Sequence, residues 1–207
     1  MKTVLQVALL LAIVVLGYFL YQSISTPIRY EEEQSKRYGK VIQRIKDIRT
    51  AQVAFKSEYG KYTGSFDTLI TFIKTGHFNV EKRTGSADDS TAIAKGLFKR
   101  EKVQVRVLDS LFKGNIARVD SLPFIPFGGG TKFELGAGEL MTASKVPVKV
   151  FETKAADSII FRSYVASNPR YKQILVNKTE EKKKLDKYAG IKVGSLTEAT
   201  NNAGNWE

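Results

Sequence analysis

Few residues in this sequence have the types and the spacing that enzymatic chemistry requires. The run FGGGTKF, Phe127 to Phe133, invites comparison with a phosphate-binding loop, whose backbone amides hold phosphate oxygens between a strand and a helix. That loop has the spacing G-x-x-x-x-G-K-[ST], whereas here the lysine follows Thr131 and a strand-like pattern comes next. We interpret the run as a flexible hairpin loop.

Other side chains with donor atoms for metals or protons are isolated. The run SADDS, Ser86 to Ser90, has two adjacent carboxylates but lacks the further spaced oxygen ligands that a hard cation needs. His77 is the single histidine, and there is no cysteine, so thiolate sites and cysteine nucleophiles are excluded. We predict no enzymatic activity, no catalytic residue, no cofactor and no bound metal.

The chain is strongly basic, with a net charge of +12. Such a charge favours anionic partners, among them phospholipid headgroups, acidic proteins, wall polymers and nucleic acid. The most basic run is EEKKKLDK, Glu180 to Lys187, which we interpret as the solvated face of a helix. Aromatic residues that could stack on bases are not interleaved with the basic ones, so we expect no nucleic-acid partner.

An uncharged apolar segment near the N-terminus is the clearest feature of the sequence. A helix from Val4 to Ile24 would span about 30 Å, the thickness of the hydrocarbon core of a bilayer. Its bulky end does not resemble a signal-peptide cleavage site. We expect an uncleaved transmembrane anchor over residues 1–25. The positions that represent this anchor are Val4, Leu10, Val15, Tyr18, Tyr21 and Ile24.

An amphipathic helix and a short second helix are predicted over residues 26–76. Pro27 predicts a break or kink, after which a helix runs from about Ile28 to Tyr59 and passes through polar, solvent-exposed first turns. Its apolar stripe should pack on a sheet, through Tyr38, Ile42, Ile45, Ile48, Phe55 and Tyr59. The opposite face is basic and expected to be exposed, with Lys36, Arg37, Lys40, Arg44, Lys46, Arg49 and Lys56. Gly60 ends this helix, and Ser65 caps the next.

Residues 77–196 are predicted to form an antiparallel, strand-rich domain, followed by a tail over residues 197–207. We expect a loop or hairpin after His77, a helical turn in STAIAKG, and a charged helix over Lys178 to Gly190. Period-two alternation and apolar runs predict the strands Arg100 to Phe112, Lys132 to Met141, Val146 to Thr153, SIIFRSYVA, YKQILVN and IKVGSL. Pro147 suggests an edge position for its strand. Helices segregated from an antiparallel sheet indicate the α+β class.

A loop rich in proline, phenylalanine and glycine interrupts this domain. It reads LPFIPFGGG, Leu122 to Gly130. The residues that we expect to contact a partner are Phe124, Phe127 and Gly129.

The run IQRIKDIRTAQVAFKSEYGKYTGSFDTLITFI, Ile42 to Ile73, resembles the type IV pilins and the pseudopilins of type II secretion. Comparable places are occupied by Ala54-Phe55, Tyr59-Gly60, Tyr62-Thr63 and Leu69. The resemblance implies an apolar helix that continues into an amphipathic one, packed beneath an antiparallel sheet. Pilins carry a glycine before the leader cleavage point and a glutamate near the start of the apolar helix, and MKTVLQVALL has neither. The C-terminal run GIKVGSLTEATNNAGNWE resembles the ends of single-pass envelope proteins of the Bacteroidota, which implies a periplasmic domain.

Together these patterns lead us to expect a non-enzymatic, pilin-like subunit or scaffold of a bacterial secretion or surface-export assembly. Its partners would be the inner membrane and other envelope proteins. The basic residues that follow the anchor favour a cytoplasmic domain under the positive-inside rule, against both resemblances. Alternatives are a filament-forming pilin, a membrane-tethered module that binds an acidic wall polymer, lipid or protein, and, weakest, an enzyme.

Overall fold

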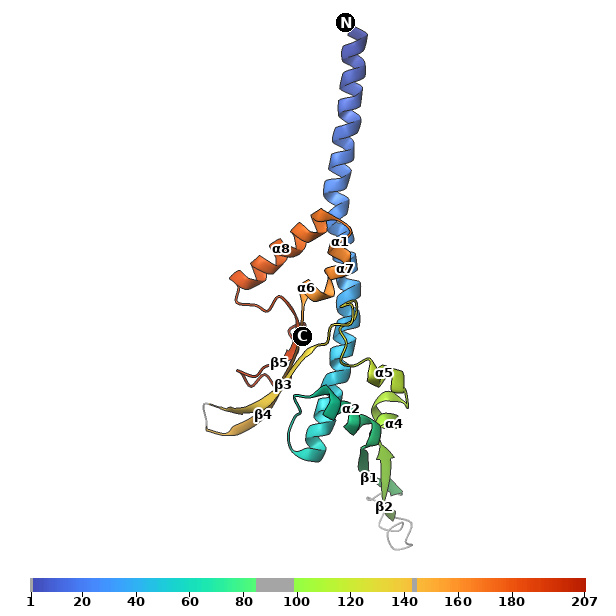
Figure 1. Ribbon diagram of the computed structural model, residues 1–207, viewed down its shortest axis with the longest axis vertical. Coiled ribbons are helices and arrows are strands. Elements are labelled where there is room, and N and C mark those ends of the chain that lie inside the picture. The colour runs from blue at the N-terminus through green and yellow to red at the C-terminus, as the bar shows by residue number, and fades with distance from the viewer. Residues whose placement is uncertain (1, 85–98, 143–144) are drawn as a thin grey trace.

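A computed structural model describes residues 2–84, 99–142 and 145–207. Its spine is the helix α1, Lys2–Tyr59, whose N-terminal part projects away from the rest of the molecule (Figure 1). The buried residues of α1 begin at Thr26, where the other elements start to pack on it. The chain therefore consists of a protruding helical segment, residues 2–25, and a head, residues 26–207, built on the second half of the same helix.

Of the break or kink predicted at Pro27, the break is wrong, because α1 continues through this residue. A proline inside a helix removes one backbone hydrogen bond, at a cost of about 3 kcal/mol. Next to it, the Thr26 hydroxyl donates to the Gln22 carbonyl oxygen at 2.6 Å. The turns after Pro27 do not cross solvent as expected either, because Tyr30 and Arg37 are buried against the head. This packing keeps the helix continuous.

The predicted joint after α1 is present. Gly60 adopts a left-handed conformation (φ +69°), and its N–H donates to the Lys56 carbonyl oxygen at 2.8 Å. The buried Gln52 side chain fixes the turn through both its amide atoms, which bond to the Thr63 backbone at 2.6 and 3.1 Å. Helix α2, Phe66–Thr75, begins after Ser65, although the Ser65 side chain makes no capping hydrogen bond.

A two-stranded hairpin follows α2. Strand β1, His77–Thr84, pairs antiparallel with β2, Lys99–Arg106. The predicted strand up to Phe112 is too long, because Val107–Phe112 forms helix α4, which is followed by α5, Ile116–Asp120. The SADDS carboxylates and the STAIAKG segment lie outside the described residues.

The main sheet has three antiparallel strands in the order β3-β4-β5. They are Glu134–Met141, Pro147–Ala156 and Gly190–Gly194. Strand β4 is central, so the edge position expected from Pro147 is wrong. The proline is the first residue of the strand, a position where a missing amide donor is tolerated. β5 is an edge strand, and the C-terminal tail docks along it through the bridge between Val193 and Gly204.

The segments predicted as strands between β4 and β5 are helices. They are α6, Asp157–Ile160, α7, Arg162–Val165, and α8, Pro169–Lys184. The start of α8 is set locally, because the Asn168 side chain accepts a bond from the Arg170 N–H at 2.9 Å and a proline takes the first helical position. Residues 178–184 of the predicted helix thus belong to the second half of a longer one, which ends at Lys184. The predicted end at Gly190 is wrong, because this residue opens β5. The chain is α+β as predicted, but residues 77–196 contain more helix than expected.

The core lies where α1 packs against α2, α8 and β5, with α4 packed on α2. From the predicted stripe, Ile45 and Ile48 are fully buried, and Phe55 nearly so, while Tyr38 and Ile42 are partly buried against the same cluster. Tyr59 differs from expectation, because 56% of its surface is exposed. The centre of its ring lies 4.6 Å from the centre of the Phe55 ring, at the C-terminal end of α1.

Candidate functional site at the junction of helix and head

The protruding segment of α1 presents its apolar side chains to the outside on every face. All residues from 2 to 21 are exposed. The predicted anchor positions are half or more exposed, from Val15 at 50% to Val4 at 72%. Within the described residues, α1 is the single helix long and apolar enough to cross a membrane, with a mean hydropathy of 2.5 in its most apolar window and none of that window buried. These properties fit a single-pass membrane anchor.

Arg37 connects the spine to two other parts of the head. Its guanidinium donates to Glu33 Oε1 at 2.7 Å, to the Ile160 carbonyl oxygen at 2.9 Å and to Ser163 Oγ at 3.2 Å. It also lies over the ring of Phe127, 4.6 Å from its centre. The residue is only 7% exposed, so its expected place on a solvated basic face is wrong. A buried guanidinium is tolerated here because several donors are satisfied.

A second polar contact joins α1, α6 and α8. The Tyr38 hydroxyl donates to Asp157 Oδ1 at 2.6 Å, and the Lys182 ammonium donates to Asp157 Oδ2 at 2.9 Å. Asp157 is 2% exposed, so these two partners take the place of the water that an exposed carboxylate would bind. Burial raises the pKa of Tyr38, and the neighbouring Asp157 carboxylate raises it further. Tyr38 therefore remains a protonated donor at neutral pH.

Aromatic rings fill the space just below the protruding segment. Tyr30 is fully buried, and its ring stacks on Phe161 at 5.6 Å and lies 6.1 to 6.2 Å from Tyr164 and Tyr171. The Tyr164 hydroxyl donates to the Arg29 carbonyl oxygen at 3.3 Å. Burial raises the pKa of Tyr164 to about 12. This cluster attaches α7 and the start of α8 to the first turns of α1 that follow the apolar segment.

The predicted partner loop lies partly against α1. Phe127 has φ +65°, a conformation that costs a non-glycine residue of order 1–3 kcal/mol, and its ring faces Arg37. Phe124 is 40% exposed and makes no such contact with α1. A side chain at Gly129 would meet open space. Of the three predicted contact residues, Phe124 and Gly129 therefore remain at the surface, whereas Phe127 also helps to enclose Arg37.

Two shallow hollows lie between α1 and α8, on either side of Tyr38 and Lys182. The one towards β5 measures about 500 Å³. Its apolar lining includes Ile42, Ile191 and Trp206, and its charged lining has three lysines, Lys182, Lys187 and Lys192, and one acid, Asp186. The other, towards the protruding segment, measures about 680 Å³. Sequence reasoning missed this region because α8 was predicted as a strand and a shorter helix.

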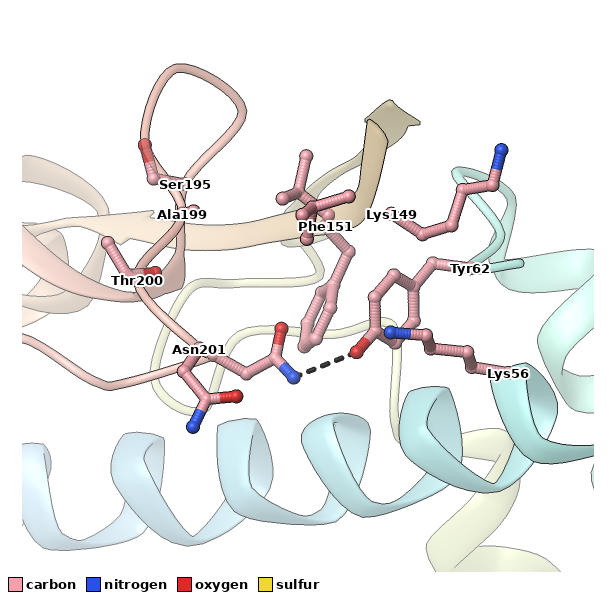
Figure 2. A pocket seen from close by; sticks show the side chains of 11 residues that line it. Lys56, Tyr62, Lys149, Phe151, Ser195, Ala199, Thr200 and Asn201 are labelled. Carbon is pink, nitrogen blue, oxygen red and sulfur yellow. Dashed lines mark hydrogen bonds between the residues drawn. The ribbon is translucent and has the colours of Figure 1, made fainter. Parts of the chain in front are cut away.

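A much smaller pocket lies between the C-terminal part of α1, β4 and the tail (Figure 2). Tyr62 forms one wall, accepting a hydrogen bond from Asn202 Nδ2 at 2.8 Å, and Lys56 lies 4.8 Å from the centre of its ring. Lys149 points away from the pocket in Figure 2 and pairs with Glu139. With a volume of about 60 Å³, the pocket has room for little more than water.

The contacts of Arg37, Tyr38 and the tyrosine cluster attach α1 to α6, α7 and α8. His77 opens β1, is exposed, and has no nucleophile or carboxylate among its described hydrogen-bond partners. No group of three or more His, Asp or Glu side chains within the described ranges could hold a metal ion. Comparison of the chain with protein-family models, curated proteins and solved structures finds no match.

Proposed function

We propose that this protein is a non-enzymatic, single-pass subunit or scaffold of a bacterial envelope assembly, with a pilin-like layout. The observation that carries this proposal is the continuity of α1. One helix of 58 residues is an exposed apolar rod in its first half and the buried spine of the head in its second. An anchor joined to its domain by a flexible linker would leave that domain free to move. Here the spine fixes the height and orientation of the head above the membrane.

The contacts at the junction support a role that depends on rigidity. Arg37 attaches α1 to α6 and α7, and the Tyr38–Asp157–Lys182 contact attaches it to α8. The Arg37 guanidinium and the Asp157 carboxylate at their centres are buried, and hydrogen bonds to buried charged groups are strong. A scaffold needs such fixed geometry, because partners on the membrane and on the head must meet it at set positions.

The proposal places the head in the periplasm and the anchor in the inner membrane. Because the chain has no cysteine, one cysteine introduced in the head reports its side of the membrane. A cysteine at the exposed position Lys113 should react with a membrane-impermeant maleimide in cells with a permeabilised outer membrane. Labelling that requires lysis of the inner membrane would place the head in the cytoplasm instead.

Partners are tested by photo-crosslinking in native membranes. A photoreactive amino acid at Phe124, which is exposed in the loop, should capture one or a few defined membrane proteins. The matched control is Ile116, an exposed apolar residue on α5. Recovery of the protein alone from both positions, together with its purification as a monomer from solubilised membranes, would refute the scaffold proposal.

A tethered binding module is the second candidate, and the hollow beside β5 is the observation that favours it. Its apolar lining and its lysines suit an acidic ligand with an apolar part. Binding of an acidic wall polymer should weaken in high salt, because exposed charges are screened over about 10 Å at 0.1 M salt. No binding at low salt would eliminate this candidate. A filament-forming pilin predicts cleavage of the N-terminus, so recovery of an intact N-terminal peptide would argue against it.

A further inference from the structure

The end of the head nearest the apolar segment carries a distinct basic surface. The stretch from Ser158 to Thr179 contains no acidic residue. Three of its basic residues, Arg162, Arg170 and Lys172, are exposed and form no ion pair with any described residue. We call these three residues the shoulder. They lie on α7 and the first turn of α8, at the top of the head in Figure 1.

The height of the shoulder follows from its contacts with α1. Tyr164 and Tyr171 hold α7 and α8 against Tyr30, and Tyr164 also bonds to the Arg29 carbonyl oxygen. About 20 residues of helix cross the hydrocarbon core, and the headgroup layer adds about 5–8 Å on each side. If the crossing begins at Val4, it ends near Ser23, and at 1.5 Å per residue Tyr30 lies about 10 Å beyond. The shoulder therefore lies at the outer boundary of the headgroups.

The chemistry of the shoulder matches that boundary. Arginine and lysine side chains are long enough to reach several ångströms towards phosphate oxygens while their stems stay on the protein. Tyrosines such as Tyr164 and Tyr171 are typical of the membrane interface. Two exposed carboxylates, Glu31 and Glu32, are on α1 at a similar height, and Glu31 pairs with Lys178 at 3.5 Å. Positive charge thus prevails on the α7–α8 side of the spine.

We propose that the shoulder binds the anionic phospholipid headgroups of the membrane that holds α1. The head then has two attachments to the bilayer, the anchor and an electrostatic contact beside it, and the second one opposes tilting of α1 and the head together relative to the bilayer. This inference rests on α1 standing in a membrane, but it holds for either orientation of the head. Each basic residue near an anionic surface is expected to raise the ratio of membrane-contacting to non-contacting heads about fivefold, and the three together about a hundredfold.

The test uses the full chain in lipid nanodiscs, one set of phosphatidylcholine and one that also contains phosphatidylglycerol. Ala166 is exposed in the connection between α7 and α8, and a cysteine there is the only one in the chain. A fluorophore on this cysteine should be less accessible to acrylamide, a neutral aqueous quencher, in the anionic discs. High salt should restore the accessibility.

Two matched variants decide whether the shoulder is responsible. Arg162→Gln/Arg170→Gln/Lys172→Gln should remove the difference between the two lipids. The control changes the same number of charges at the far end of α8 and just beyond it, as Lys183→Gln/Lys184→Gln/Lys187→Gln, and should retain the difference. Circular dichroism checks that both variants are folded.

The possible failures can be told apart. Equal accessibility in both lipids, or equal loss in both variants, would overturn the lipid contact and leave the anchor intact. A chain that stays in solution without entering the discs would overturn the contact together with the proposed membrane function.

Discussion

Replacement of Arg37 by methionine should destabilise the head without moving the anchor. Methionine keeps most of the side-chain length but removes the three hydrogen bonds and the contact with the Phe127 ring. The Ile160 carbonyl oxygen would then lack its buried donor, which costs about 1–3 kcal/mol. Glu33 and Ser163 are partly or fully exposed and can bond to water.

The expected change in the free energy of unfolding is smaller than the sum of the losses from the individual contacts. Loss of a cation–π contact in a desolvated place adds about 2 kcal/mol, whereas the cost of burying a guanidinium is recovered. We expect a loss of about 3 kcal/mol in the free energy of unfolding. For a domain of this size that corresponds to a fall of about 6–12 °C in Tm. Arg37→Lys should lie in between, because an ammonium cannot replace the planar fork of donors.

Trp206 makes the measurement specific for the head. It is the only tryptophan, and its side chain packs against the core beside β5, so its fluorescence reports unfolding of the head and not of the anchor. The matched control is Lys40→Met on an exposed position of α1, which should change the unfolding free energy by less than about 0.5 kcal/mol. If the variants at 37 and 40 unfold at the same temperature in detergent, Arg37 does not tie the spine to the head.

Three further predictions concern the junction and the tail. Tyr38→Phe removes the donor to Asp157 and should cost about 1–2 kcal/mol at neutral pH. The raised pKa of Tyr38 stabilises the folded native protein below pH 10, and this contribution is lost as the pH rises above 10. Chemical unfolding should therefore show a smaller loss of stability between pH 10 and 11 in the variant than in the native protein. The hydrogen bond from Arg49 lowers the pKa of Glu207. The contact between Arg49 and Glu207 is therefore complete above about pH 4.5 and is lost as the pH falls through the lowered pKa. The fluorescence of Trp206 should show this transition, and Glu207→Gln should lack it. Spin labels two turns before and two turns after Pro27 should lie about 21 Å apart in the native protein, because α1 runs through the proline. Pro27→Ala should leave this distance unchanged. A broad set of shorter distances in the native protein would contradict the continuity of α1.

Patterns with a single physical cause were predicted correctly from the sequence. The uncharged segment of α1 can be predicted from composition and length alone, and the buried stripe around Ile45 and Ile48 from helical periodicity alone. The strands β3, β4 and β5 alternate or end at turn residues, so they were found to within a few positions. The glycine at residue 60 ends its helix because that conformation suits glycine.

Other features depend on contacts between distant residues. The segment Tyr171 to Asn177 has apolar residues that fit a short strand as well as a helix, and the signal that decides, Asn168-Pro169 at the start of α8, was overlooked. Arg37 has no local mark that separates it from the exposed Lys36 and Lys40. Its burial is decided by Phe127, Ile160 and Ser163, which lie about 90 to 126 residues away along the chain.

The sequence alone determined that the chain has one apolar helix able to cross a membrane and an α+β head, because composition and periodicity fix burial within a single element. Only the tertiary structure decided that the two share one continuous helix. Pro27 weakens α1 locally, but the packing of Tyr30 and Arg37 against the head compensates for the lost hydrogen bond. The same packing places the basic shoulder beside the first turns of α1 that follow the apolar segment, a position that no local pattern contains.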